Sequence, residues 1–517
     1  MMPKQALRTV VRSPATLIAG LGLLTLLGVA LRQIGAGERS LWHDELYALH
    51  AVLRPTESLT TWPLVDNGNM YLFYLLAHVW VRLLPAIPPL DEAALRNLPI
   101  AFSVLAIPAT FLVAQTAGRS LFSEITMSKL TALLGTLSIV ISPVAILYGQ
   151  DFRAYTLQLL LIALSTLSIL IAFTYQNPRY QWLTWIMYAV TASALPYTHM
   201  LSAPTIFAQI TGGLILTLSP RYQHLRSPLL LSAIAIFIAI LPLAAAVLTA
   251  GGGQIRWIDP ITMERVINVV STLIGAPQGY SEPLLTITLL GNATLLLLGI
   301  LGSIRLIRGA APVTTLIVYP LFFTLLSGAL ISVAGRQLWV ERYYSHLGLH
   351  VAVLIGCGAA MSIHWAWKQR TTIRQITSAV LVVSAMIVTY AGNLSISSAV
   401  ASRETIQDWK GVAVVFNTHC VGNSTIQIFT GKADIKALKL YGVDLSNRIL
   451  LRSTDPLPTF LTGGTACLFS RSNIYERMRE YELLNSLRTQ GSVTQLYERQ
   501  YKVDERGVTA VYVVQID

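Results

Sequence analysis

The chain has few charged residues. Only 12% of its 517 residues are Asp, Glu, Lys or Arg, and 54% are hydrophobic, whereas about a quarter of an average soluble domain is charged. The deficit is uneven, because 36 of the first 400 residues are charged, against 26 of the last 117. This distribution excludes a soluble enzyme, a disordered chain and a fibrous protein. It predicts a membrane-embedded body followed by a globular tail.

The chain also has few cysteines and none of the common cofactor signatures. Its three cysteines (Cys357, Cys420 and Cys467) show no metal-ligand spacing, and the sequence contains neither a P-loop nor a GxGxxG fingerprint. We therefore expect no cofactor and name no metal ligand, although a divalent metal is compatible with the sequence. Cys420 and Cys467 both lie in the tail, where one disulfide is compatible with an extracytoplasmic location.

Long apolar runs are plentiful, and eleven of them are long enough to cross a bilayer as helices. They lie near residues 15-34, 96-117, 128-148, 154-175, 181-198, 200-218, 228-249, 283-304, 312-333, 344-363 and 375-396. A basic leader precedes the first run without a convincing cleavage site, so we expect an uncleaved helix rather than a signal peptide. The sequence thus predicts a mainly α, polytopic membrane domain over residues 1-399.

The few charges predict how the chain crosses the membrane. With a cytoplasmic N-terminus, the inner segments carry 13 cations and a single acid, Glu124, while the other 12 acids of the first 400 residues lie outside beside ten cations. This asymmetry follows the positive-inside rule and accounts for the net charge of +12 without a nucleic-acid partner. We expect a multi-pass protein of the plasma (inner) membrane whose tail lies outside the cytoplasm.

One apolar segment is too short to count as a span. The run Met70–Leu84 has 15 residues and contains His78 and Arg82, and counting it would place the basic loops outside. We therefore expect a helix lying in the outer interface. The first outer loop then covers residues 35-95, and ordered loops of this length are usually functional.

In this orientation, several polar clusters fall on the outer face, where ionisable groups at membrane depth are often functional. They are residues 42–47, 66–69, 150–155, 197–199, 251–282 and 341–344. Each also has an ordinary structural explanation. Asp44 and Glu45 could cap a helix, Arg153 could pair with Asp151, His199 could be a satisfied interfacial residue, and Tyr343 could belong to an aromatic belt.

An ordered set of segments resembles the GT-C glycosyltransferases, and within them the family 39 group of protein mannosyltransferases and aminoarabinose transferases (ArnT-like). The segments are LWHDELYAL, DNGNMYLFYLLAHVWVRLL, EAALRNLPIAFSVLAIPATFLVAQTAGR, SPVAILYGQDFRAYTLQLLL, PYTHM and ERYYSHLGLHVAVLIG. Together they cover most of residues 35-365 in the expected order. The resemblance implies a GT-C fold and a polyprenyl-phosphate-linked sugar donor. It also implies an acceptor on the outer (periplasmic) face, which could be a glycan, a lipid or a protein.

The resemblance also implies roles for individual residues. Asp44 matches the catalytic base, with Glu45 as a supporting carboxylate. Asp66 keeps the acid of the second motif, although the residues after it lack the His/Lys and prolines usual in the family, which puts the sugar or acceptor preference in doubt. The acid and the arginine of the family's third motif are kept as Asp151 and Arg153.

The remaining site assignments follow from the outer clusters. For the donor phosphate, whose charge suits the planar guanidinium group, the candidates are Arg342, Arg153 and Arg256, in that order. For substrate binding, we name Asn69, Tyr71, Gln150, Asp151, Tyr155, His199 and Tyr343. A lipid phosphate leaves as a stable anion, so a base suffices without a general acid, and a single attack predicts inversion.

The tail, residues 400-517, reads as a small α/β domain. The runs VAVVF, TACLF and VTAVYVVQ are typical of strands. Residues 473–490 have helical spacing, with Ser472 or Asn473 as a cap and Gly491 after the end. No catalytic set is present in it, and a role as a lid or acceptor platform is favoured.

Two alternatives stay open at this point. Eleven spans would also suit a transporter or lipid flippase, although such proteins usually carry midplane charges and internal repeats. An inactive, enzyme-like scaffold is the other. The sequence leaves undetermined the sugar, the acceptor, the metal dependence, the oligomeric state and the arginine that holds the phosphate.

Overall fold

The structure is a computed structural model that describes most of the chain. The described residues are 13–61, 64–85, 90–175, 178–249, 258–277, 285–305, 311–369, 371–403, 408–420, 426–429, 432–445, 448–450, 466–472, 493–502 and 508–516. They form two compact units. The membrane unit comprises Met1–Ile34, Ala51–Val79 and Arg96–Ser402, and the tail unit comprises Gly35–His50, Trp80–Leu95 and Arg403–Asp517. The predicted boundary at residue 400 stays a prediction.

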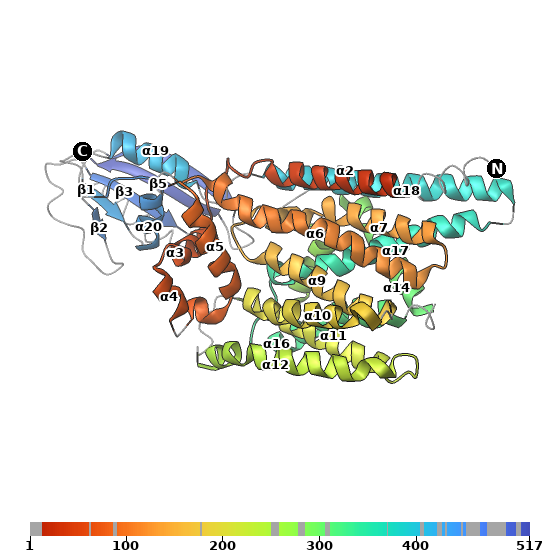
Figure 1. Cartoon of the computed structure of the whole chain (residues 1–517). Coiled ribbons are helices and arrows are strands. Elements are labelled where there is room, and N and C mark those ends of the chain that lie inside the picture. The colour runs from red at the N-terminus through yellow and green to blue at the C-terminus, as the bar shows by residue number, and fades with distance from the viewer. Residues whose placement is uncertain are drawn as a thin grey trace. The chain divides into compact units, whose positions relative to one another are not determined.

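Long helices dominate the membrane unit (Figure 1). They are α2 (Pro14–Gln33), α6 (Glu92–Leu121), α7 (Ile125–Val140), α9 (Tyr155–Thr174), α10 (Pro178–Thr198), α11 (Ala203–Leu216), α12 (Arg226–Thr249), α14 (Leu285–Arg305), α16 (Tyr319–Val333), α17 (Gly348–Trp367) and α18 (Thr372–Ala401). Shorter elements connect them, namely α4 (Thr56–Thr60), η1 (Val65–Gly68), α5 (Tyr71–Leu83), α8 (Pro143–Leu147), η2 (Tyr148–Gln150), η3 (Met200–Ser202), η4 (Gln223–Leu225), α13 (Met263–Leu273), η6 (Thr314–Val318) and η7 (Glu341–Leu347).

Each of the eleven predicted spans contains a helix. Among the described residues, eight helices are long and apolar enough to cross a membrane, and a pair bent by 51°, Ile125–Val140 with Pro143–Gln150, makes up to nine. The two other predicted spans correspond to α10, which is not one of the eight, and to Met200–Leu216, which is shorter. The chain is a mainly α polytopic membrane protein, as predicted; the number eleven and the orientation stay predictions. Met70–Leu84 contains α5, a short helix outside the candidate spans.

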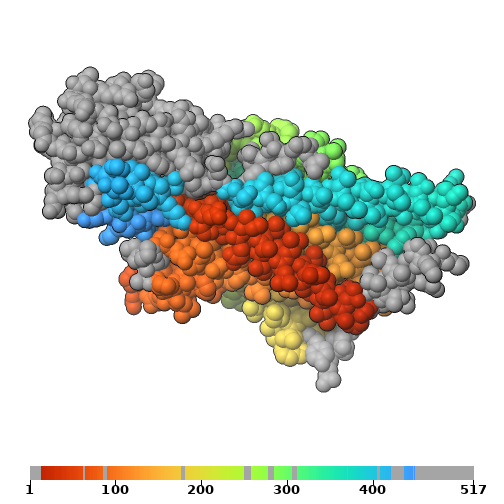
Figure 2. Space-filling model, turned by 90° about the horizontal axis from the view of Figure 1, so that it is seen from above, coloured from red at the N-terminus to blue at the C-terminus, as the bar shows by residue number. Residues whose placement is uncertain are grey.

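Helix α17 packs between α7 and α14, and glycines permit the close approach. A Cβ atom at Gly358 would meet the carbonyl group of Leu295 in α14, and one at Gly356 would meet the backbone of Gly135 in α7. Small residues at such contacts let helix backbones approach closely in a membrane protein. The first and last long helices, α2 and α18, lie side by side although they are far apart in the sequence (Figures 1 and 2).

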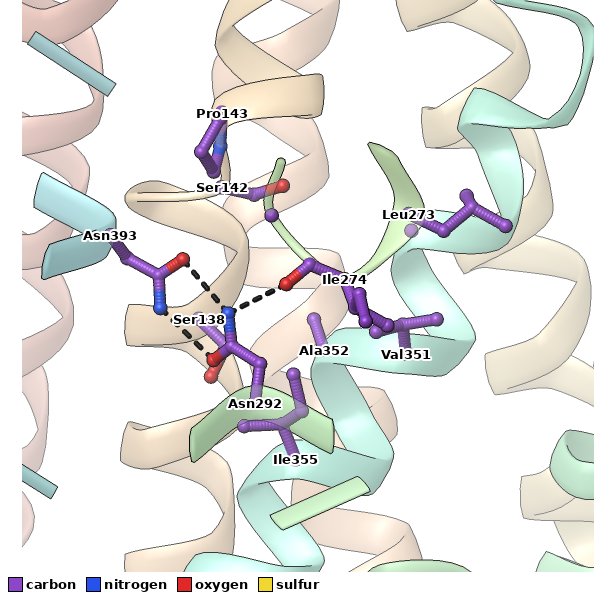
Figure 3. A pocket seen from close by; sticks show the side chains of 12 residues that line it. Ser138, Ser142, Pro143, Leu273, Ile274, Asn292, Val351, Ala352, Ile355 and Asn393 are labelled. Atoms are coloured by element: carbon purple, nitrogen blue, oxygen red, sulfur yellow. Dashed lines mark hydrogen bonds between the residues drawn. The ribbon is translucent and has the colours of Figure 1, made fainter. Parts of the chain in front are cut away.

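A reciprocal amide pair joins α14 to α18 (Figure 3). The side chains of Asn292 and Asn393 each donate to the other's oxygen at 3.0 Å, and Asn292 also donates to the carbonyl of Ile274 at 2.7 Å. The cavity beside them holds about 20 Å³, which is room for one water molecule and far too little for a sugar. This polar site therefore serves helix association.

The tail unit contains a five-stranded mixed sheet in the order β2-β1-β3-β5-β4. Its strands are β1 (Ile426–Phe429), β2 (Arg448–Leu450), β3 (Ala466–Ser472), β4 (Val493–Lys502) and β5 (Val508–Ile516), and its helices include α19 (Trp409–His419) and α20 (Lys432–Leu440). Strand β1 pairs in parallel with β2 and β3, while β5 pairs antiparallel with β3 and β4. The predicted α/β tail is confirmed, with ACLF of the run TACLF in β3 and VTAVYVVQ in β5.

One predicted strand is wrong. The run VAVVF, residues 412–416, belongs to helix α19, in which Trp409, Val412, Ala413 and Phe416 are buried. That spacing of three and four residues is helical, and the Asp408 side chain caps the helix by accepting from the Gly411 N–H at 3.0 Å. The spacing therefore outweighs the β-propensity of valine. The predicted helix 473–490 and its cap Asn473 lie outside the described residues. Cys420 is disulfide-bonded, and Cys357 is a buried free thiol.

Candidate active site

Asp44 and Glu45 lie in the first turn of α3 (His43–Val52), but their surroundings differ. Glu45 is fully buried, and its Oε2 accepts the backbone N–H of Trp42 at 3.1 Å. This is the backward half of a capping box, in which an acid in the first turn satisfies the amide of the residue before the helix. The structural explanation thus fits Glu45, whereas the Asp44 carboxylate is partly exposed and its role stays a prediction.

The segment with Asp66 has an unusual backbone. Asp66, Asn67 and Met70 have positive φ angles of 55°, 51° and 58°, a region that costs residues other than glycine free energy and that is often found at functional sites. The Tyr74 hydroxyl donates to Asp66 Oδ2 at 3.2 Å, and Asn69 Nδ2 donates to the same oxygen at 3.5 Å. The carboxylate is therefore held by its own neighbours. Tyr71 is half-buried.

The third predicted motif follows the bend between α7 and α8. Gln150 is fully buried, and its side-chain amide donates to the carbonyls of Ile34 at 2.6 Å and Arg32 at 3.3 Å, at the end of α2. Its side chain therefore anchors the segment, and its role in substrate binding stays a prediction. Phe152 packs edge-on against Phe73 of α5, with ring centroids 5.5 Å apart. This contact links the segment to the helix that follows Asp66.

Five predicted residues come together in what we call the basic–aromatic cluster: Arg153, Tyr155, His199, Arg342 and Tyr343. The His199 ring lies 4.9 Å from the Tyr343 ring and 6.1 Å from the Tyr155 ring, and the Arg342 guanidinium lies 5.6 Å from the centre of the Tyr343 ring. Burial, together with the positive charges of Arg153 and Arg342, lowers the pKa of His199 to about 3. Both arginines therefore lie close to the same neutral imidazole.

Two acids of the neighbouring motifs, Asp151 and Glu341, lie near the cluster. Asp151, Glu341 and Arg342 all act electrostatically on Tyr148, whose ring lies 5.3 Å from that of Tyr155. The positive charge of the cluster is thus partly balanced by carboxylates.

A buried network that the sequence analysis missed holds η7, the segment that carries Arg342. The side-chain amide of Gln158 in α9 donates to His346 Nδ1 at 3.1 Å, and the other ring nitrogen, Nε2, lies 3.0 Å from the Thr205 hydroxyl in α11. Because Nδ1 accepts, Nε2 carries the proton and donates to Thr205. His346 thereby fixes η7 to two helices.

A second missed residue is Arg32, fully buried near the end of α2. Its guanidinium donates to Ser103 Oγ at 2.6 Å and to the carbonyls of Val140 and Ile139 at 3.2 and 3.3 Å. The last carbonyls of a helix lack intrahelical partners, so Arg32 satisfies the end of α7 where the span bends. A charge inside a predicted span was the sequence signal that could have revealed it.

Three further predicted residues are not placed relative to the cluster. Asp44 and Glu45 belong to the tail unit, and Arg256 lies outside the described residues. Within the described part of the chain, His, Cys, Asp and Glu form no group of three that could hold a metal ion.

No protein-family model and no curated protein matches the chain, but solved structures do. The structure of ArnT from Cupriavidus metallidurans in the apo state matches with a TM-score of 0.57 at 11% identity, over 97% of this chain and 98% of that protein. The chain has the fold of ArnT. The predicted GT-C fold is thereby confirmed.

Two further solved structures also match this chain. ArnT bound to undecaprenyl phosphate matches with a TM-score of 0.54 at 13% identity, over 95% of this chain and 97% of ArnT. An oligosaccharyltransferase from Archaeoglobus fulgidus matches with a TM-score of 0.47 at 14% identity, and this chain spans only 62% of its length. At such identities the likeness to ArnT concerns the fold alone.

Proposed function

We propose that the chain is an integral membrane glycosyltransferase that moves a sugar from a polyprenyl-phosphate donor to an acceptor hydroxyl on the outer face of the plasma membrane. The basic–aromatic cluster is the observation that carries this proposal. Arg153 and Arg342 can neutralise a phosphate, and the half-buried ring of Tyr343, which lies against His199, can contact a sugar. The ArnT structure with undecaprenyl phosphate supports this class of donor.

In the proposed reaction, Asp44 takes the proton of the acceptor hydroxyl as its oxygen attacks the anomeric carbon. The bond from that carbon to the phosphate oxygen breaks, and the electron pair leaves with the lipid phosphate. Arg342 and Arg153 stabilise the charge that develops there. A single displacement inverts the anomeric centre, and NMR of the product would reveal this.

The acceptor is a glycan, lipid or protein hydroxyl, and the N-terminus faces the cytoplasm in this proposal. The transporter alternative rests on the number of spans alone. The cluster of two arginines beside three aromatic rings gives a specific reason to prefer group transfer.

Purified protein in vesicles tests the proposal with synthetic undecaprenyl-phosphate hexoses and pentoses and with envelope glycans and lipids as acceptors. Asp44→Asn should abolish release of undecaprenyl phosphate, because an amide cannot take the proton. Asp91→Asn is the matched control: Asp91 lies in the same loop, where it accepts the Ala94 N–H at 2.9 Å, and asparagine can also cap a helix. Full transfer by Asp44→Asn would refute the assigned base.

A further inference from the structure

An ion pair with one buried partner lies in the tail unit. Lys410 Nζ in α19 lies 2.9 Å from Oε2 of Glu92, whose side chain is 2% exposed. Glu92 lies near the end of the first outer loop, at the start of α6 and more than 300 residues earlier in the chain. Removing the Lys410 ammonium group is costly, because the buried carboxylate of Glu92 would lose its counter-charge. The pair therefore holds two distant segments of the tail unit together.

Lys410 also forms hydrogen bonds to the loop that leads to Asp44. Lys410 Nζ donates to the carbonyl of Gly37 at 2.7 Å, and the Lys410 backbone N–H donates to Ser40 Oγ at 3.1 Å. Tyr441, just after α20, accepts the backbone N–H of Leu41 with its hydroxyl at 2.8 Å. Burial and the negative charge of Glu92 raise the pKa of Tyr441, so this hydroxyl stays protonated. Three hydrogen bonds thus fix residues 37–41.

The segment between these three hydrogen bonds and the proposed base, Asp44, is short and constrained. Leu41 is fully buried, α3 begins two residues later, and the Glu45 side chain ties that helix back to Trp42. Each residue spans at most about 3.6 Å, so a shift of the 37–41 loop moves Asp44 with it.

We propose that Lys410, Glu92 and Tyr441 are positioning residues that set the location of the Asp44 carboxylate. The role of the tail in this proposal is to hold the loop that leads to the base. This inference rests on the proposed function, in which Asp44 is the base. It assigns the tail a task that its lack of catalytic residues does not reveal.

Kinetics of the full-length protein test this proposal. Lys410→Met and Tyr441→Phe should lower kcat on the order of 10- to 100-fold, because small displacements of a catalytic group cost this much, while KM for the undecaprenyl-phosphate sugar stays unchanged. Lys410→Arg, which keeps the charge, should restore most of the rate. The matched control is Arg265→Met, which removes an exposed ion pair at 2.6 Å to Asp259 in the membrane unit and should leave kcat unchanged.

A second measurement does not depend on activity. A spin label on His43→Cys, an exposed position beside Asp44, should be immobilised in the native background and become mobile with Lys410→Met or Tyr441→Phe. Tyr441→Phe keeps the ring and removes only the hydroxyl, so it tests the loop even if Lys410→Met fails to fold. Native kcat and native label mobility in Tyr441→Phe and Lys410→Met would overturn the inference. Activity of Asp44→Asn would instead overturn the proposed function.

Discussion

The two arginines of the basic–aromatic cluster should contribute unequally to phosphate binding. Arg153 is 7% exposed, whereas Arg342 is half-buried over the Tyr343 ring. A hydrogen bond to a charged group contributes about 1.5–3 kcal/mol, with the upper end expected where water is excluded and the lower end where solvent screens the charge. This order reverses the ranking from the sequence, which placed Arg342 first.

The expected losses follow from these values. Since about 1.4 kcal/mol is a factor of ten in Kd, Arg153→Gln should weaken binding of undecaprenyl phosphate roughly 100-fold and Arg342→Gln roughly 10-fold. Because the Debye length falls from about 8 Å at 0.15 M salt to about 3 Å at 1 M, salt should reduce the Arg342 contribution and leave that of Arg153 largely intact. The double variant reports whether both groups contact the same anion, because only then do their effects depart from additivity.

Native mass spectrometry of the protein in nanodiscs with graded amounts of undecaprenyl phosphate measures these constants. Arg336→Gln serves as the control, because Arg336 is an exposed arginine six residues before Arg342. A Kd for Arg153→Gln equal to that of the control, or a larger and salt-resistant loss for Arg342→Gln, would refute the reasoning from burial.

Four further results are expected. His346→Leu frees η7 and should weaken undecaprenyl phosphate binding about tenfold, whereas Gln209→Leu, which removes a buried amide bonded to Thr166 at 3.0 Å, should not change it. Arg32→Met should lower the Tm in a thermal scan, because two buried carbonyls lose a donor at about 1–3 kcal/mol each. Gly358→Val should abolish folded protein on size exclusion, while Gly22→Val, where a Cβ meets nothing within 4 Å, should not. The folded-state pKa of His199 lies below its ordinary value, so the contribution of His199 to stability is complete above about pH 6.5 and declines as the pH falls toward 3. Between pH 7 and pH 5, the free energy of unfolding of the native protein should therefore fall by about 2 kcal/mol more than that of His199→Asn. Thermal scans at both pH values would measure this difference.

The long helices of the membrane unit could be predicted because a run of about 20 apolar residues indicates a membrane-spanning helix, whatever it packs against. Strands β3 and β5 could be predicted for a similar reason, since their β-branched and apolar runs are bounded by polar residues. The run at 412–416 was predicted as a strand because valine favours strands. It is helical because Trp409 and Phe416 are buried on the same face of a helix.

The site was predictable in part for a different reason. Arg153, His199 and Arg342 could be grouped because each lies at the same predicted end of a span. Arg32 and His346 could not, because their roles depend on partners more than 100 residues away, such as Val140 for Arg32 and Gln158 for His346. The role of a buried polar side chain depends on its hydrogen-bond partners, and partners that are distant in the chain cannot be identified from the sequence alone.

Arg32 also has a consequence for biosynthesis. Helix α2 leaves the ribosome about a hundred residues before Ile139 and Val140, whose carbonyls the Arg32 guanidinium contacts. Until those residues are inserted, a charge at this depth is expensive in lipid, and the side chain must extend to the headgroups instead. We therefore expect α2 to reach its final depth only after α7 has entered the membrane, so that a nascent chain cut before residue 139 should hold α2 closer to the surface.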